Sequence, residues 1–243
     1  MDSQHFWDHM DCLSEESIEK IEADLIESIW KNYDIRTDTL LFDTTNFFTY
    51  IDSTNERCTI AQRGKNKQKR TDLRQIGYAL VVTREDHIPL FQHTYVGNQP
   101  DCITFQKVIE KIKKRLTLLN LDFSRHTLIF DKGMPTKKNF AMIDDLKCSY
   151  VTSIKLAGHK DLIESFKENA EEISVNEEKV LAFRSKKKIC NKERVALIYL
   201  SETLREGVMR GIRESITKRI KLLDEIQRKL VSSKRKINQE KKK

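Results

Sequence analysis

The segment LLFDTTNFFTYI, residues 40–51, decides the fold that we expect. It is rich in β-branched and aromatic residues, which favour strands, and it carries one carboxylate, Asp43, inside an apolar run. An ionised carboxylate among such neighbours costs free energy unless it is paired or binds a cation. We therefore predict a strand at this position with a functional aspartate inside it.

Downstream of this strand, the sequence patterns alternate between strands and helices. Residues 52–74 are polar and basic and have no apolar period, so we predict a loop there. The loop is followed by a hairpin of two strands, a helix, a strand, a short helix and a last strand, which we predict over residues 76–84, 90–96, 101–119, 126–130, 136–146 and 150–156. This order fits a mixed sheet with helices packed against it.

A second carboxylate, Asp131, ends the strand at residues 126–130, directly before Lys132 and Gly133. If this strand lies beside the strand of Asp43, the two carboxylates meet and can hold oxygen-preferring ions such as Mg²⁺. Two such ions about 4 Å apart can activate a nucleophile and stabilise the leaving oxygen of a phosphodiester. The alternative is that Asp43 caps a threonine-rich turn and that Asp131 is an ordinary turn residue.

The two ends of the chain differ in charge. Residues 1–39 hold 11 acidic and 3 basic residues, and Ser14 is the expected N-cap of a helix from about Glu15 to Lys31. Residues 205–243 hold 14 basic and 5 acidic residues. We predict four segments: an acidic helical lead-in, the main sheet, a region with a charged helix and a separate hairpin of two short apolar runs, and a long basic amphipathic helix with a lysine-rich tail. Their bounds are 1–39, 40–158, 159–201 and 202–243.

Composition excludes several classes of protein. No apolar stretch reaches the roughly 18 residues that a membrane crossing needs, and the acidic N-terminus is unlike a signal peptide, so we expect a cytoplasmic protein without a membrane partner. The five cysteines are scattered and never spaced as C-x-x-C, which signals neither a disulfide framework nor a zinc site. The net charge of +8 suits a polyanionic partner.

Four separate segments resemble, in the same order, the DDE-type transposases of insertion sequences, in the group with a β-rich insertion before the catalytic glutamate. The first is the opening segment, LLFDTTNFFTYI, with its D-x-T-N-x-F pattern. The last, TLIFDKGMPTKKN, carries the pattern D-x-G-M…N. The other three segments are RTDLRQIGYAL (70–80), PLFQHTYVGNQPDCITF (89–105) and TLIFDKGMPTKKN (127–139). The resemblance covers roughly residues 10–235.

This resemblance implies an α/β fold: a ribonuclease H-like mixed sheet flanked by helices, with a partial insertion region and a long C-terminal helix. It makes Asp43 and Asp131 the first and second catalytic residues, which ligate Mg²⁺ or Mn²⁺, with two ions expected in the complete enzyme. It implies double-stranded DNA as partner, both transposon ends and target, and a nucleoid-associated protein of a prokaryotic cytoplasm, and it leaves homodimerisation open.

The resemblance also makes the basic loop a DNA-binding candidate, with phosphate contacts from Lys65, Lys67, Lys69, Arg70 and Arg74. The alternative is an ordinary solvated basic loop. Gly97, Asn98, Asp101 and Thr104 match the family pattern as well. For these four we predict only a turn and a helix N-cap.

One departure from the family pattern affects the expected activity. These enzymes carry a third acidic ligand, a glutamate in a pattern like Y-x2-R-x3-E-x6-K, and this pattern does not occur in the chain. We therefore expect this chain alone to be incomplete and inactive in DNA cleavage and strand transfer. One alternative is a non-catalytic DNA-binding or regulatory remnant of a transposase. Another is a helical interaction module, which requires that residues 40–156 form no mixed sheet.

Overall fold

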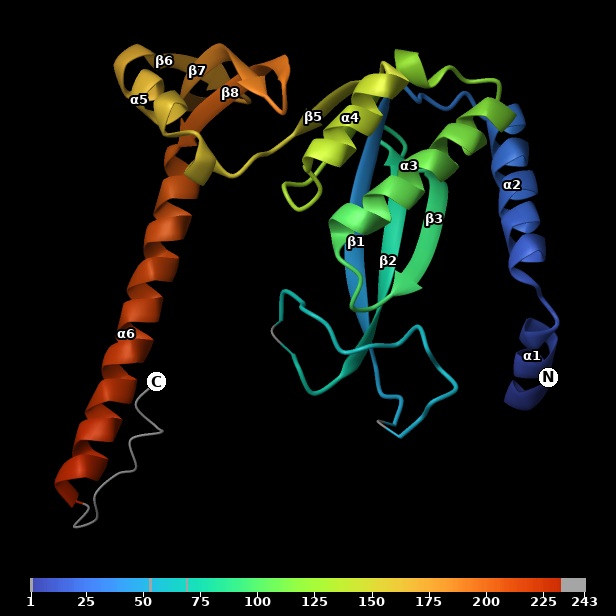
Figure 1. Cartoon of the computed structure of the whole chain (residues 1–243), viewed down its shortest axis with the longest axis horizontal. Helices are drawn as coiled ribbons and strands as arrows, with labels where there is room; N and C mark the ends of the chain where they lie inside the picture. The colour runs from blue at the N-terminus through green and yellow to red at the C-terminus, as the bar shows by residue number, and fades with distance from the viewer. Residues whose placement is uncertain (1, 53, 69, 233–243) are drawn as a thin grey trace. The chain divides into compact units, whose positions relative to one another are not determined.

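The computed structural model describes residues 2–52, 54–68 and 70–232. The chain divides into two compact units, Met1–Lys155 (unit 1) and Leu156–Lys243 (unit 2), and each is considered by itself (Figure 1). None of the helices in the described residues combines the length and apolar composition that crossing a membrane requires. The division into the four predicted segments stays a prediction.

Unit 1 is built on a five-stranded mixed sheet with the strand order β3-β2-β1-β4-β5. Its strands are β1 (Thr39–Thr49), β2 (Arg74–Thr83), β3 (Pro89–Val96), β4 (Thr127–Phe130) and β5 (Ser149–Thr152). β1 pairs parallel with β4, and β4 with β5, whereas β2 is antiparallel to both β1 and β3. This is the order and direction of a ribonuclease H-like sheet, so the predicted fold class is confirmed.

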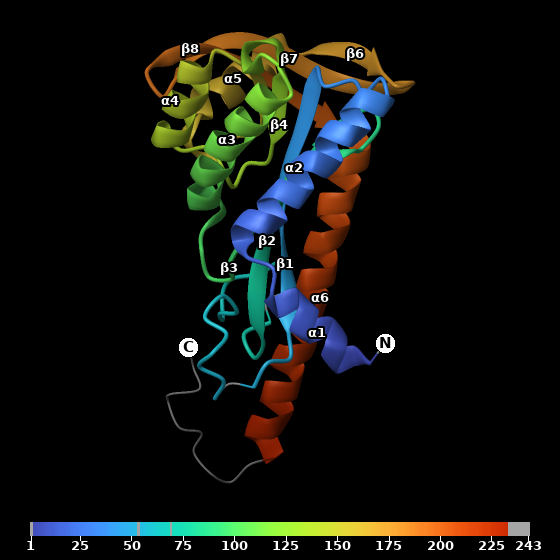
Figure 2. The same cartoon turned by 90° about the vertical axis from the view of Figure 1, so that its right-hand side faces the viewer.

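Two helices, α3 (Asp101–Leu118) and α4 (Lys137–Leu146), cover one face of this sheet (Figures 1 and 2). The apolar stripe of α3 supplies the centre of the core, where Phe105 is fully buried against the strands that carry the two carboxylates. Its ring lies 5.4 Å from that of Phe42 on β1 and 4.8 Å from that of Phe130 on β4. The residues directly before Asp43 and Asp131 are therefore fixed by one shared contact.

The acidic lead-in forms two helices, α1 (Ser3–Asp11) and α2 (Glu15–Asn32). Ser14 caps α2 as predicted, because its hydroxyl accepts a hydrogen bond from the Ser17 N–H at 3.1 Å. Figure 2 shows α2 in full. Its Glu22 carboxylate pairs with the Arg115 guanidinium of α3 at 3.2 Å and accepts the Gln92 N–H of β3, so α2 lies beside β3 and α3.

Three elements of unit 1 differ from the sequence prediction. The helix α1 was not predicted, and it buries no residue. A short 3-10 helix, η1 (Phe123–Arg125), precedes β4. The last strand ends at Thr152 and not at Leu156, because its partner β4 ends at Phe130, which pairs with Thr152. Local composition cannot reveal where a neighbouring strand stops.

Unit 2 is a three-stranded antiparallel sheet, in the order β6-β7-β8, with two α-helices. Its elements are η2 (Leu156–Gly158), α5 (Lys160–Asn169), β6 (Glu171–Val175), β7 (Glu178–Ile189), β8 (Lys192–Ser201) and α6 (Glu202–Ser232). The predicted hairpin and long helix are confirmed. The sequence did not predict β6, whose residues are all exposed. The lysine-rich tail, 233–243, lies outside the described residues.

Candidate functional site

The sheet brings Asp43 and Asp131 to neighbouring positions. Asp43 is part of β1, and Asp131 directly follows β4. The parallel ladder between these strands ends with the pair Phe42 and Phe130, and each aspartate is the next residue along its strand. Because neighbouring strands lie about 5 Å apart, the two aspartates stand side by side at one end of the ladder.

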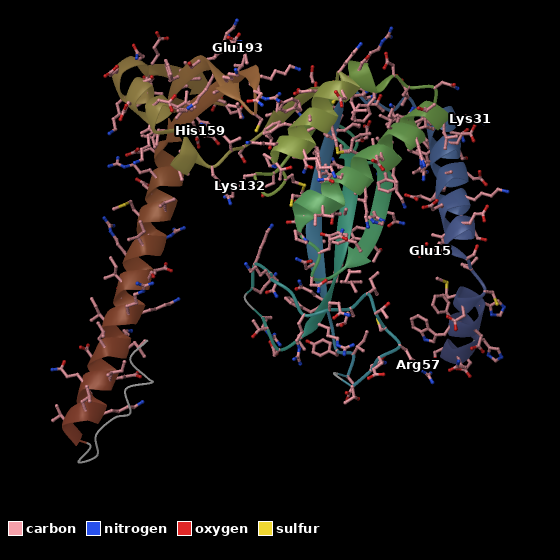
Figure 3. The ribbon with its side chains drawn as sticks, in the orientation of Figure 1. Glu15, Lys31, Arg57, Lys132, His159 and Glu193 are labelled. Carbon is pink, nitrogen blue, oxygen red and sulfur yellow. The ribbon has the colours of Figure 1, made fainter. Side chains whose placement is uncertain are left out.

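Both carboxylates are exposed, so the burial cost that the sequence suggested for Asp43 does not arise. One oxygen of each is held by the chain itself. Asp43 Oδ1 accepts the N–H of Thr44 at 2.8 Å, and Asp131 Oδ1 accepts the N–H of Lys132, labelled in Figure 3, at 2.6 Å. These local bonds orient the two carboxylates.

A pocket of about 280 Å³ contains both aspartates. Four segments line it: the middle of β1, the basic loop, the start of α3 and the turn after β4. The lining residues are Asp43, Thr44, Thr45, Asn46, Lys65, Asn66, Lys67, Gln68, Asp101, Asp131, Gly133 and Met134. The pocket therefore joins carboxylates to lysines, as a site for a metal ion and a phosphate would.

Asp101 is a third carboxylate of this pocket, which sequence reasoning assigned only to a helix cap. The N-cap of α3 is in fact Pro100. Asp101 Oδ1 accepts the Tyr95 hydroxyl at 3.2 Å, and burial together with this carboxylate raises the pKa of Tyr95 to about 12. Within the described residues, no three His, Cys, Asp or Glu side chains come close enough to hold one metal ion. Asp101 therefore shares the pocket without completing a three-ligand cluster.

Asn139 fixes the turn that follows Asp131, a role for which sequence gave no physical reason. This fully buried side chain donates from Nδ2 to the Met134 carbonyl at 2.7 Å and to the Cys102 carbonyl at 3.0 Å. Its Oδ1 accepts the side-chain amide of Gln106 at 2.8 Å. Asn139 thus ties the Asp131 turn to the first turn of α3, which begins with Asp101.

The basic residues predicted to contact DNA do not share one location, as far as the structure describes them. Lys65 and Lys67 are exposed and line the pocket. Arg70 lies outside the pocket lining and pairs with Asp72 at 2.6 Å, and this hydrogen-bonded guanidinium lowers the pKa of the Asp72 carboxyl to about 2. Arg74 is also outside the lining and donates to the Asn55 carbonyl at 2.8 Å. Lys69 lies outside the described residues.

The basic loop is fastened to the sheet at Gln75 and Gly97. The buried Gln75 amide donates to the Gly97 carbonyl at 2.7 Å and to the Lys65 carbonyl at 3.3 Å. Its backbone forms two hydrogen bonds with Gln62, of 2.9 and 3.0 Å. A Cβ on Gly97 would lie only 1.7 Å from the Gln75 carbonyl oxygen, so the close approach requires glycine here. These contacts hold Lys65 at the pocket, which a freely solvated loop would not do.

Comparison with protein families gives one match. The family model described as "Transposase DDE domain" matches residues 48–232, about three quarters of the chain. The matched range includes Asp131 and begins five residues after Asp43. No curated protein matches the chain.

Among solved structures, the chain is similar to two transposases bound to DNA. One is the Mos1 transposase paired-end complex with the left transposon end, at 13% identity and a TM-score of 0.34, covering 63% of this chain and 46% of that one. The other is the piggyBac transposase synaptic complex with hairpin DNA, at 11% identity and a TM-score of 0.38, covering 82% of this chain and 43% of that one. This chain spans less than half of the length of either transposase.

Proposed function

The chain belongs to the transposase DDE domain family, and on this premise we propose that its pocket carries two of the carboxylates of a metal-dependent centre for DNA cleavage and strand transfer. In this proposal Asp43 and Asp131 are the metal ligands, and Lys65 and Lys67 contact DNA phosphates. The partner is double-stranded DNA, at the ends of the element and at its target. A location at the prokaryotic nucleoid, in the cytoplasm, agrees with this partner and stays a prediction, as does homodimerisation.

The juxtaposition of Asp43 and Asp131 in one pocket carries this proposal. Each carboxylate accepts a single backbone N–H at one oxygen through the bonds described above, which leaves its other oxygen as a donor for a cation. Carboxylate oxygens are the ligands that Mg²⁺ and Mn²⁺ prefer. The donor set of the pocket therefore fits a hard divalent ion, and the complete enzyme is expected to hold two.

When bound, such ions would activate the attacking oxygen and stabilise the leaving oxygen of a phosphodiester. The chain itself supplies the positioning. Asn139 holds the turn that carries Asp131, and Gln75 holds the loop that carries Lys65. Lys65 and Lys67 line the pocket from a different segment than Asp131, and their ammonium groups can neutralise phosphate charge next to the carboxylates.

The test is metal-promoted binding of DNA, measured by fluorescence anisotropy with a labelled duplex in EDTA and in Mn²⁺. We expect Mn²⁺ to raise the affinity of the unaltered chain and to have a much smaller effect on D43N or D131N, because Asp43 and Asp131 would hold the ion and its charge would attract DNA phosphate. K65Q/K67Q should weaken binding in both conditions. If D43N responds to Mn²⁺ like the unaltered chain, the proposal fails, and DNA binding without a metal centre is the better description.

A further inference from the structure

The end of the hairpin of β7 and β8 concentrates positive charge among the described residues of unit 2 that lie outside the long helix. Residues 184–194 include six basic side chains and one acidic side chain, Glu193, which Figure 3 labels. The strands pair without a register shift from Val180 to Ile189. Cys190 and Asn191 form the two-residue turn with φ values of 50° and 67°, the backbone that tight hairpins favour. The charge therefore sits on an ordered ribbon.

One face of this ribbon is occupied by α5. The side chains of Phe183, Ser185 and Lys187 are half-buried on that side. Lys187 is 18% exposed and forms an ion pair with Asp161, in the first turn of α5. The ammonium group of Lys187 is thus paired within unit 2.

The opposite face is open and combines two kinds of side chain in parallel rows. Arg184, Lys186 and Lys188 stand at alternate positions of β7, about 7 Å apart, and all three are exposed. The paired row on β8 is apolar and equally open: Val195 (55% exposed), Leu197 (60%) and Tyr199 (57%). Glu193 is the acidic residue on this face, and its carboxylate lies 3.4 Å from the Lys186 ammonium.

Protection of a sheet edge explains the cationic row of this face but not the apolar row. β6 pairs with β7 only as far as Ala182, so the lysines beyond it lie on an unpaired edge, where lysine discourages aggregation. That role does not require a neighbouring row of exposed apolar side chains. A surface with a cationic row beside an apolar and aromatic row fits a partner that offers both negative charge and apolar surface. DNA does so, with phosphates beside sugars and bases.

We propose that this open face, defined by Arg184, Lys186, Lys188, Val195, Leu197 and Tyr199, is a second DNA-binding surface. The cationic row contacts successive phosphates of one strand, and the apolar row lies against the sugars and base edges. A two-stranded ribbon is narrow enough to enter the major groove. The choice of DNA as partner rests on the proposed function, whereas the surface itself is a property of unit 2.

The test compares three variants of the full chain with the unaltered chain in EDTA, with a labelled 20-base-pair duplex at several NaCl concentrations. R184Q/K186Q/K188Q removes the row. K107Q/K113Q/K114Q removes three exposed lysines of α3 and is matched in charge. R184K/K186R/K188R keeps the charge.

We expect removal of the row to make the dependence of log K on log salt less steep by roughly 2 to 3 and to weaken binding roughly tenfold or more, because each phosphate contact contributes about 0.9 to that slope. The charge-keeping variant should bind like the unaltered chain. The α3 variant should keep the slope.

Hydrogen exchange of the unaltered chain gives a readout that needs no variant, since DNA should protect residues 184–199. Equal slopes for the row variant and the α3 variant, or no protection of 184–199, overturn the proposal. So does a preference of this face for vesicles of anionic lipid, or loss of self-association in the row variant without loss of DNA binding. Because the assay contains no metal, its outcome does not depend on metal binding by the pocket, which separates this proposal from that of the pocket.

Discussion

The helices α3 and α6 have the same kind of sequence and opposite surroundings. Both place apolar residues at intervals of three and four. α3 buries seven side chains within unit 1. On α6 the apolar side chains of the described residues are exposed, with Val208 at 62%, Ile216 at 52% and Leu223 at 64%. An amphipathic pattern therefore predicts a helix. Whether the apolar face of that helix is buried depends on whether the same unit offers a surface that packs against the face.

The largest contrast should appear when one isoleucine is shortened in each helix. Ile109 of α3 is 1% exposed and Ile216 of α6 is 52% exposed. We expect I109A to lower the free energy of unfolding by roughly 2 to 5 kcal/mol, because it leaves a cavity in the core. I216A should change it by less than about 0.5 kcal/mol. Urea unfolding measures both, and a cost for I216A as large as that for I109A would mean that α6 is covered.

Replacing one glycine by alanine should change stability in opposite directions in the two units. A Cβ on Gly97 collides with the Gln75 carbonyl, so we expect G97A to destabilise unit 1 by roughly 1 to 3 kcal/mol and to displace the basic loop. Around Gly207 of α6 there is open space within 4 Å. G207A should stabilise α6 by about 0.5 to 1 kcal/mol through helix propensity. Thermal melts followed by circular dichroism check the sign of each change.

Removal of an asparagine side chain should distinguish the units in the same way. N139A removes a donor from each of the Met134 and Cys102 carbonyls, and we expect a loss of roughly 1 to 3 kcal/mol in the free energy of unfolding. In unit 2, Asn169 donates to the Ser165 carbonyl at 3.0 Å but is exposed, so N169A is the matched control with an effect below about 0.5 kcal/mol. Hydrogen exchange in the turn after Asp131 should quicken only in N139A. Unchanged exchange there would remove Asn139 from its positioning role.

Loss of one ion pair in each unit, Arg70–Asp72 and Lys187–Asp161, should have similar consequences and give the smallest effects. The hydrogen bond from Arg70 lowers the pKa of Asp72 to about 2, and that from Lys187 lowers the pKa of Asp161. Because the folded-state pKa lies below the unfolded value, the stabilisation is present above about pH 4 and is lost as pH falls through the folded-state value. Carboxyl NMR titrations should show each pKa return toward 3.8 in R70A and K187A. An unshifted Asp72 in R70A would contradict the assigned cause.

Much of the fold of unit 1 was predictable because its signals are local. The apolar runs around Asp43 and before Asp131 identify two strands, and the turn at Gly97 separates β3 from α3. Other features depend on residues far apart in the chain. Gln75 meets Gly97 across 22 positions, and Asn139 meets Cys102 across 37. No local pattern distinguishes such residues from ordinary polar ones.

The same limit applies to the site. Sequence resemblance placed Asp43 and Asp131 in order, but it could not separate Lys65 and Lys67, which line the pocket, from Arg70, which is paired with Asp72. It also gave no reason to put Asp101 in the pocket, since its place there depends on how α3 begins relative to the turn after β4. Three-dimensional contacts decide which members of a charged run face a site.

Direct titration with Mn²⁺ tests the central claim, that Asp43 and Asp131 together hold a divalent ion. Calorimetry or electron paramagnetic resonance of the unaltered chain should detect binding, and D43N and D131N should each weaken it roughly tenfold or more, because each removes a carboxylate ligand. D86N, which alters an exposed aspartate in the turn between β2 and β3, should bind as the unaltered chain does. Equal Mn²⁺ binding by the double variant D43N/D131N and the unaltered chain would contradict the account.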